Sequence, residues 1–244
     1  MTRRAVVSEG SRKIIFWSFF NVMRKKPLPH VATPEWNEHR FRIWRYYTCA
    51  SILQQTLPSF EYWFICDDSL QALSEPFRSL LPDPRVKLVF HSQLVSLARA
   101  LADHPTVIFA RIDSDDMYHP TVAEVLASAP ISEPFFQFNR GYFLDIHNGR
   151  LHDWTSVSSP FFARIYRGDE LRTLEAFETP VHHDVRHRAR VLGRGMFMVL
   201  FHGKNTSTSP ASRSCGQEHL GARRDEILAE FHVPPLESMG MDGT

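Results

Sequence analysis

Three carboxylates follow one apolar run in the stretch TVIFARIDSDDMYHP, which covers residues 106–120. The run 106–112 is typical of a buried strand, and Asp113, Asp115 and Asp116 come directly after it. Asp113 and Asp115 are two residues apart, so their side chains point to the same side of an extended backbone. Paired carboxylates suit Mg²⁺ and Mn²⁺, whose remaining positions substrate phosphates fill. The alternative is a solvated acidic turn before the next helix, where negative charge is also favourable.

A second acidic pair, Asp67 and Asp68, follows another apolar run at 61–66. The first half of the chain alternates such runs with segments of helical periodicity. Strands are expected at 13–22, 61–66, 86–90 and 106–112, and helices at 39–55, 70–81, 93–102 and 121–128. Apolar strands that helices connect form a parallel sheet covered on both faces, and ligands bind beyond the carboxyl ends of its strands. Both acidic clusters are therefore predicted on one rim of an α/β fold, as a site for a metal and a phosphate group.

The second half of the chain has a different pattern. The runs 135–144 and 150–154 predict a hairpin around the turn at 147–149. Further strands are expected at 161–167 and 195–201, and helices at 171–177, 184–191 and 218–231. These elements predict a smaller mixed region beside the parallel sheet.

The composition is that of an ordinary globular protein, with 43% hydrophobic and 23% charged residues in a chain of 244. A formal net charge of +1 and the absence of DNA- or RNA-reading motifs argue against a nucleic-acid partner. The three cysteines, Cys49, Cys66 and Cys215, form no CxxC pair, which favours a reducing compartment. The apolar run near the N-terminus has roughly ten residues, too few to cross a bilayer. We expect a cytoplasmic protein that can associate with a membrane surface.

Two segments resemble the nucleotide-binding elements of glycosyltransferases with the GT-A fold. FICDDS at 64–69 is similar to the strand end that contacts the nucleotide, and ARIDSDD at 110–116 is similar to the DxD element. FRIWRYYTCASILQQTLPSFEYWFICDD, together with RIDSDD and the later HGKNTS at 202–207, resembles the bacterial putative rhamnosyltransferase family. One departure concerns the donor: Ser18-Phe19-Phe20 stands where we expect Thr-Arg-Phe after the first strand.

The resemblance implies a Rossmann-like, mostly parallel sheet with helices on both faces and a smaller mixed region on the acceptor side. It divides the chain into a nucleotide-sugar-binding half at 1–130, an acceptor-side half of the same domain at 131–210, and a C-terminal helix and tail at 211–244.

The resemblance also implies roles for the residues of the rim. Those that would bind the nucleotide sugar are Asp67, Asp68, Arg111, Asp113 and Lys204. Those that would hold Mn²⁺ or Mg²⁺ are Asp113, Asp115 and His202, with help from Asp116. For His202 a plain core or surface histidine is an equal alternative, and for Lys204 a solvated lysine is at least as good an explanation.

The implied reaction moves a sugar from a nucleoside-diphosphate donor to an acceptor hydroxyl. Negative charge grows on the leaving diphosphate, and a bound cation stabilises it. In an inverting displacement a carboxylate takes the proton of the acceptor. Asp184 is the first candidate for this base, Asp153 the second and His183 the third. Helix capping is an alternative role for Asp184.

The leading hypothesis is thus a metal-dependent glycosyltransferase of the hexosyltransferase type, with rhamnose as one candidate sugar and surface polysaccharide as one context. Its partners would be the donor and a carbohydrate, lipid-linked or small-molecule acceptor. A nucleotidyltransferase that makes sugar nucleotides is the second hypothesis, although its Gly-rich loop is missing from RKKPLPH at 24–30. A non-catalytic nucleotide-sugar-binding protein of the same fold is the third.

Overall fold

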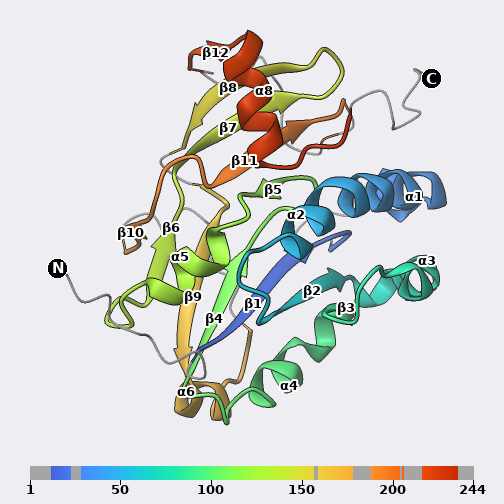
Figure 1. Cartoon of the computed structure of the whole chain (residues 1–244). Helices are drawn as coiled ribbons and strands as arrows, with labels where there is room; N and C mark the ends of the chain where they lie inside the picture. The colour runs from blue at the N-terminus through green and yellow to red at the C-terminus, as the bar shows by residue number, and fades with distance from the viewer. Residues whose placement is uncertain are drawn as a thin grey trace, which may run out of the picture.

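The computed structural model describes residues 12–22, 29–156, 159–177, 188–203, 205 and 216–235. These residues form two β-sheets with helices packed against them, one sheet above the other in the view of Figure 1. The predicted α/β fold class is confirmed, because the strands of the first half are parallel and helices connect them.

The larger sheet has the strand order β10-β6-β9-β4-β1-β2-β3. Strands β1 to β4 are mutually parallel where they pair, and β9 is antiparallel to both β4 and β6. The bounds are β1 Arg12–Phe19, β2 Phe60–Cys66, β3 Val86–Phe90, β4 Thr106–Arg111, β6 Phe135–Gln137, β9 Phe162–Arg167 and β10 Arg190–Val191. The carboxyl ends of β4, β1 and β2 therefore meet at one edge, with β1 in the middle.

The smaller sheet has the order β12-β8-β7-β11-β5. Strands β7 and β8 form the predicted hairpin, and β11 runs parallel to β7. The bounds are β5 Met117–Tyr118, β7 Arg140–Asp145, β8 Arg150–Thr155, β11 Phe197–Phe201 and β12 Glu218–His219. Since β5 directly follows the acidic loop after β4, this loop links the two sheets.

The helices are mostly short. The α-helices are α1 Pro34–Ile43, α2 Ala50–Leu53, α3 Gln71–Ser74, α4 Leu94–Arg99, α5 Val122–Ser128, α6 Gly168–Arg172 and α8 Gly221–Glu230. A π-helical segment, η2 Trp44–Cys49, joins α1 to α2, and 3-10 turns lie at η1 Pro29–Ala32, η3 Asp68–Leu70, η4 Glu75–Leu80 and η5 His91–Gln93. Within the described part of the chain, no helix is long and apolar enough to span a bilayer.

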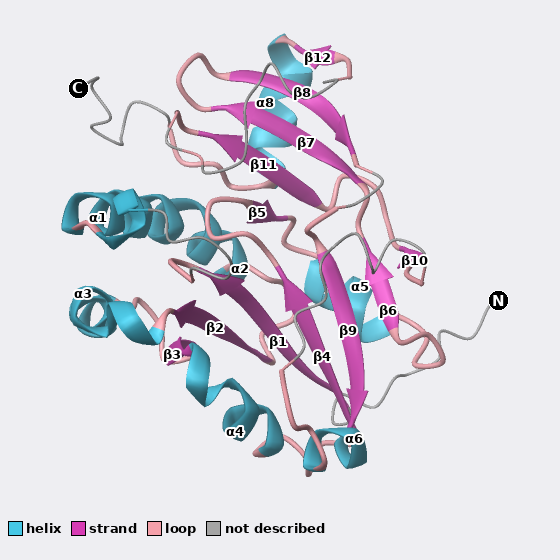
Figure 2. Ribbon diagram, turned by 180° about the vertical axis from the view of Figure 1, so that it is seen from behind, coloured by secondary structure: helices cyan, strands magenta, loops and turns pink. Residues whose placement is uncertain are grey.

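Both faces of the large sheet are buried, which explains why its strands are almost continuously apolar. Alternate residues of β1 point to opposite faces. Phe16 packs in one core with Trp44 of η2, whereas Trp17 packs in the other with Leu94 of α4 and Leu171 of α6. In Figure 2 α5 is seen behind β9 and β6, and α4 and α6 lie along the lower border of the large sheet. Helix α8 covers the smaller sheet through a third core that contains Ile227.

The first helix begins earlier than the sequence predicts. The periodicity indicates 39–55, but α1 starts at Pro34, where the Thr33 hydroxyl accepts a hydrogen bond from the Trp36 N–H at 3.3 Å. Proline is favourable in this first turn because its missing N–H would have no helical partner. The earlier start adds a full turn before Arg40.

The predicted helix 70–81 is wrong as a single element. It divides into η3, α3 and η4, because Pro76 has no N–H for a continuing α-helix. The single run 135–144 is also wrong: β6 joins the large sheet and β7 the small one. The predicted helix 171–177 lies instead at Gly168–Arg172.

Two further helix predictions need correction. At 218–231 the chain first makes β12, and α8 starts at Gly221, whose φ of +53° breaks the extended segment. Residues 184–187 of the predicted helix 184–191 lie outside the described part of the chain, and Arg190–Val191 form β10.

Candidate functional site

Both acidic clusters lie on the rim of the large sheet, as the sequence predicts. Asp67 and Asp68 follow β2, and Asp113 to Asp116 follow β4, on either side of the carboxyl end of β1. The side chains of these carboxylates nevertheless have different partners, so the acidic loop after β4 is not one uniform negative patch.

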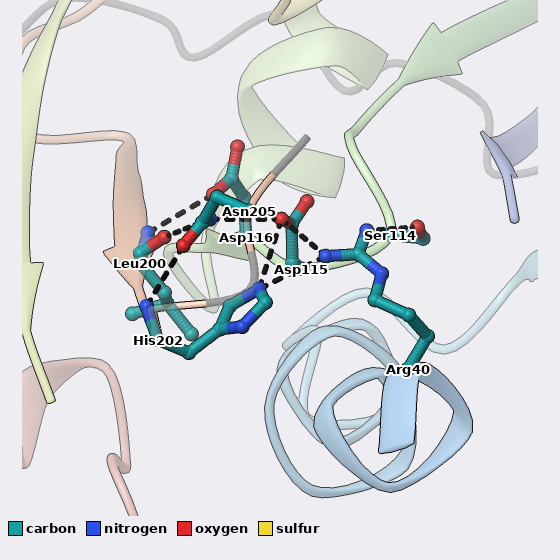
Figure 3. Close-up of polar contacts among 7 residues, drawn as sticks. All are labelled: Arg40, Ser114, Asp115, Asp116, Leu200, His202 and Asn205. Carbon is teal, nitrogen blue, oxygen red and sulfur yellow. Dashed lines mark hydrogen bonds and ion pairs between the residues drawn. The ribbon is translucent and has the colours of Figure 1, made fainter. Parts of the chain in front are cut away.

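Asp115 is the centre of a charged cluster that three parts of the chain build (Figure 3). Its Oδ2 accepts hydrogen bonds from Arg40 Nη1 at 2.6 Å and from Asn205 Nδ2 at 3.1 Å, and lies 3.2 Å from His202 Nε2. Arg40 Nη1 is also 2.9 Å from His202 Nε2. Burial opposes ionisation of Asp115, but Arg40 and His202 outweigh it and hold the pKa of this carboxyl well below its usual range.

Arg40 enters this cluster from α1 and is almost fully buried, with 4% of its surface exposed. Its Nη2 donates to Ser114 Oγ at 2.9 Å, and the guanidinium carbon lies 5.5 Å from the centre of the Trp36 ring. Arg40 was not among the site residues predicted from the sequence. The available signal is that Arg40 and Trp44 are four residues apart, which places a charge on the apolar stripe of the helix.

Asp116 and Asn205 hold the end of β11 against the acidic loop. Asp116 Oδ1 accepts the Leu200 N–H at 3.0 Å, and Asn205 Nδ2 donates to the Leu200 carbonyl at 2.9 Å. Asn205 Oδ1 also accepts the His202 N–H at 2.9 Å. Asp116 is 4% exposed and His202 1% exposed. These bonds bring His202 to Asp115, and they give Asp116 a part in the architecture that the sequence did not indicate.

Asp113 has its own cation. Its Oδ1 accepts from Arg111 Nη2 at 2.8 Å, and the Asp113 side chain is 38% exposed. Arg111 lies near the rings of Trp17 and Phe162, with its guanidinium carbon 5.9 Å and 5.7 Å from their centres. Arg111 and Asp113 thus form a partly exposed ion pair at the rim.

The three predicted metal ligands are therefore only partly brought together. Asp115 and His202 are in contact, whereas Asp113 bonds to Arg111. Across the described residues, no three His, Cys, Asp or Glu side chains gather into a group that fits a metal ion. This donor set does not fit a preformed Mn²⁺ or Mg²⁺ site, because such a site needs several free oxygen ligands. Use of a metal by the protein stays a prediction.

The other acidic pair, Asp67 and Asp68, hydrogen-bonds to the turns that follow β2 and β3. Asp67 Oδ1 accepts from the N–H and hydroxyl of Ser69 at 2.9 Å and 2.6 Å, which caps the turn η3. Asp68 accepts from the N–H of Ser92 at 3.0 Å and from its hydroxyl. Both side chains lie on the predicted rim, and their contact with a nucleotide stays a prediction.

A buried polar network lies next to Asp67 that the sequence analysis did not select. Asn21, just after β1, donates to Asn37 Oδ1 at 2.8 Å and to Ser74 Oγ at 3.0 Å, and it accepts the Asp67 N–H at 3.0 Å. Asn21 is 2% exposed, Asn37 1% and Ser74 0%. The network ties the end of β1 to α1 and α3, and so holds the rim in place.

The segment Ser18-Phe19-Phe20, which departs from the family pattern, is largely part of the core. The Ser18 hydroxyl is 2.6 Å from the hydroxyl of Tyr62, and Phe20 packs on Phe64 with ring centres 4.6 Å apart. Only Phe19 is partly exposed, and its ring lies 6.1 Å from that of His91.

The candidate bases are placed only in part. Asp153 lies on β8 of the smaller sheet, opposite Tyr142 of β7, and its Oδ1 is 2.8 Å from His219 Nε2. Its side chain is 49% exposed. Asp184 and His183, together with the predicted phosphate contact Lys204, lie outside the described residues.

Comparisons with known proteins give only weak likenesses. No protein-family model matches the chain, and no curated protein matches it. Membership of the rhamnosyltransferase family therefore stays a prediction.

Solved structures are similar at a low level, among them the following three. TarS of S. aureus is 14% identical with a TM-score of 0.37, and the match covers 91% of this chain and 43% of that one. The apo-form glycosyltransferase GlyE of Streptococcus pneumoniae TIGR4 is 8% identical with a TM-score of 0.39, covering 94% and 62%. The inositol-1-phosphate CTP transferase of T. maritima is 9% identical with a TM-score of 0.39, covering 92% and 97%.

The chain thus spans less than two thirds of the length of the first two structures. Likenesses this weak say nothing about activity, and only the geometry of the site bears on it.

Proposed function

We propose that the chain is a glycosyltransferase that binds a nucleoside-diphosphate sugar at the rim of the large sheet. One observation carries the proposal: the loop after β4 and the end of β11 converge there, so that Asp115 and His202, 87 residues apart, are in contact. Ligands of open α/β sheets bind outside the carboxyl ends of the strands, which is where this cluster lies. The sequence resemblance to the DxD element is at the same position.

The residues at the rim suit the two parts of such a donor. The Arg111–Asp113 pair is partly exposed and offers both a planar cation for phosphate oxygens and a carboxylate for ribose hydroxyls. Asp68 and Asp67 lie across β1 from this pair and are the candidates for contact with the base or ribose. These roles follow from position and chemistry, and substitution of each residue tests them.

The transfer step needs a base on the acceptor side. The acceptor hydroxyl attacks the anomeric carbon, the bond from that carbon to the diphosphate oxygen breaks, and a carboxylate takes the hydroxyl proton. Asp184 and Asp153 are the candidates within this proposal. The proposal also includes inversion at the anomeric carbon and rhamnose as the sugar. The acceptor in this proposal is a carbohydrate, a lipid-linked molecule or a small molecule. Conversion of either base to alanine should lower kcat far more than it raises KM.

The first experiment is calorimetric titration with UDP, TDP, GDP and CDP in buffer that contains Mn²⁺. One nucleoside diphosphate should bind. The protein should then form this diphosphate from the matching sugar nucleotides, slowly when water is the acceptor and faster when an acceptor hydroxyl is added. Asp115→Ala should abolish this binding. Asp83→Ala is the matched control, because Asp83 pairs with Arg85 before β3, at the opposite edge of the sheet.

Failure of all four diphosphates to bind the folded protein would refute the proposal. Release of pyrophosphate from a nucleoside triphosphate and a sugar phosphate would instead favour a nucleotidyltransferase.

A further inference from the structure

Arg40 is the cation of the Asp115 cluster. One nitrogen, Nη1, lies 2.6 Å from Asp115 Oδ2 and 2.9 Å from His202 Nε2, and Nη2 binds Ser114 in the same acidic loop. The side chain of Arg40 is 5% exposed, and that of His202 is completely buried. A single buried guanidinium thus contacts both predicted metal ligands that come together.

The two atoms that bring Asp115 and His202 together, Asp115 Oδ2 and His202 Nε2, already have other partners. Asp115 Oδ2 accepts from Arg40 and Asn205, and His202 Nε2 faces Arg40 Nη1. A guanidinium stays protonated at every accessible pH and offers its donors in a fixed plane. It can therefore hold a carboxylate and a ring nitrogen together without a metal ion between them. A divalent ion at the same position would meet the positive charge of Arg40 at close range.

The other carboxylate of the motif, Asp113, also has an arginine partner. Asp113 bonds to Arg111 rather than turning toward Asp115 and His202. Each of the two carboxylates of the DxD element therefore has an arginine partner, from α1 in one case and from β4 in the other.

We propose that Arg40 replaces the divalent cation at Asp115 and His202, so that this protein builds its rim and binds a nucleoside diphosphate without a metal at that position. Arg40 is then a positioning residue of the site. The nucleotide part of this inference rests on the proposed function, whereas the metal part concerns the free protein and can be tested alone.

The free protein is tested by titration with Mn²⁺. Binding is measured in electron paramagnetic resonance as the loss of the signal of free Mn²⁺. Wild-type protein should bind Mn²⁺ no more tightly than Asp115→Ala does. Arg40→Met removes the guanidinium and should tighten Mn²⁺ binding by about tenfold or more, because it releases Asp115 and His202.

Two controls accompany this variant. Arg85→Met removes an arginine from a different carboxylate, Asp83, and should show no such gain. Arg40→Lys keeps a positive charge beside Asp115 and His202 and should show no gain in Mn²⁺ binding. If Arg40→Met does not fold, the wild-type titration still decides, because a Mn²⁺ site that Asp115→Ala abolishes would overturn the inference.

The nucleotide test uses wild-type protein with the four nucleoside diphosphates in EDTA and in Mn²⁺. Dissociation constants that agree within about threefold support the inference. Binding that requires Mn²⁺ and is lost in Asp115→Ala overturns it and leaves the proposed function intact. Absence of binding in both buffers overturns the proposed function and the nucleotide part of the inference, while the Mn²⁺ titration still decides the metal part.

Discussion

Replacement of Asp115 by asparagine removes one negative charge from the rim with almost no change of shape. Arg40 would remain buried and charged, with 5% of its side chain exposed. Removal of one partner from a buried ion pair costs about 3–5 kcal/mol, because the remaining charge has lost its compensation. Water reaches Asp115 in part, since its side chain is 14% exposed, so we expect the lower end, about 3 kcal/mol.

Asp113→Asn is the matched control, because it is the same substitution two residues away. The Asp113 side chain is 38% exposed and its partner Arg111 is 19% exposed. Ion pairs that solvent reaches contribute roughly 0–1 kcal/mol, so we expect a loss of about 0.5 kcal/mol. The two asparagine variants should therefore differ by about 2.5 kcal/mol in the free energy of unfolding, as estimated from these two classes of ion pair.

The assay is urea unfolding monitored by tryptophan fluorescence. An unchanged slope with urea would show that the compactness of the two states is unaffected, and the midpoint of Asp115→Asn should fall by about 1 M or more. Equal stability of the two variants, or a loss below about 1 kcal/mol for Asp115→Asn, would refute the buried pairing of Arg40 with Asp115.

Three further predictions concern the frame that carries the site. Burial opposes ionisation of Glu61, but hydrogen bonds from two lysines outweigh it and lower the pKa of Glu61 to about 2. The ionised Glu61 therefore stabilises the fold above pH 4.5, and about 1 kcal/mol of the free energy of unfolding, after solvent screening, is lost as the pH falls toward 2. Glu61→Gln should remove this pH dependence in acid unfolding. Burial raises the pKa of the Cys49 and Cys66 thiols to about 12. A thiol reagent should therefore label at most one of the three cysteines before unfolding and all three after it, and fast labelling of two cysteines in the folded protein would contradict the packing. A methyl group on Gly141 would lie 2.3 Å from the Phe197 carbonyl oxygen, so Gly141→Ala should separate β7 from β11 and lower the melting temperature, at a cost of about 2 kcal/mol; an unchanged melting temperature would contradict this close approach.

The sequence was sufficient to predict the four parallel strands of the large sheet, β1 to β4. Its four parallel strands are continuous apolar runs, and the predicted strand 86–90 coincides with β3. Such runs are local patterns that burial on both faces imposes on the chain. The order of strands and helices then requires that Asp67 and Asp113 lie at one edge, because parallel strands share a carboxyl end.

The smaller sheet shows where local patterns fail. Residues 135–144 look like one strand, but β6 pairs with β9 and β7 pairs with β8 and β11. Apolar content reports that a segment is buried, and it does not report which sheet buries it. Likewise, Asp153 and His219 are 66 residues apart, and only the pairing of β8 with β12 brings them together.

The chemistry of the acidic loop was decided by the tertiary structure. From the sequence, Asp113 and Asp115 are expected to share one metal, with Asp116 assisting them. In the fold, Asp113 pairs with an arginine two residues away, Asp115 with Arg40 at a separation of 75 residues, and Asp116 with the backbone of Leu200 at a separation of 84 residues. The charge of a carboxylate is a property of its residue type, whereas its partner depends on which distant segments pack against it, and no periodicity of the sequence encodes that contact.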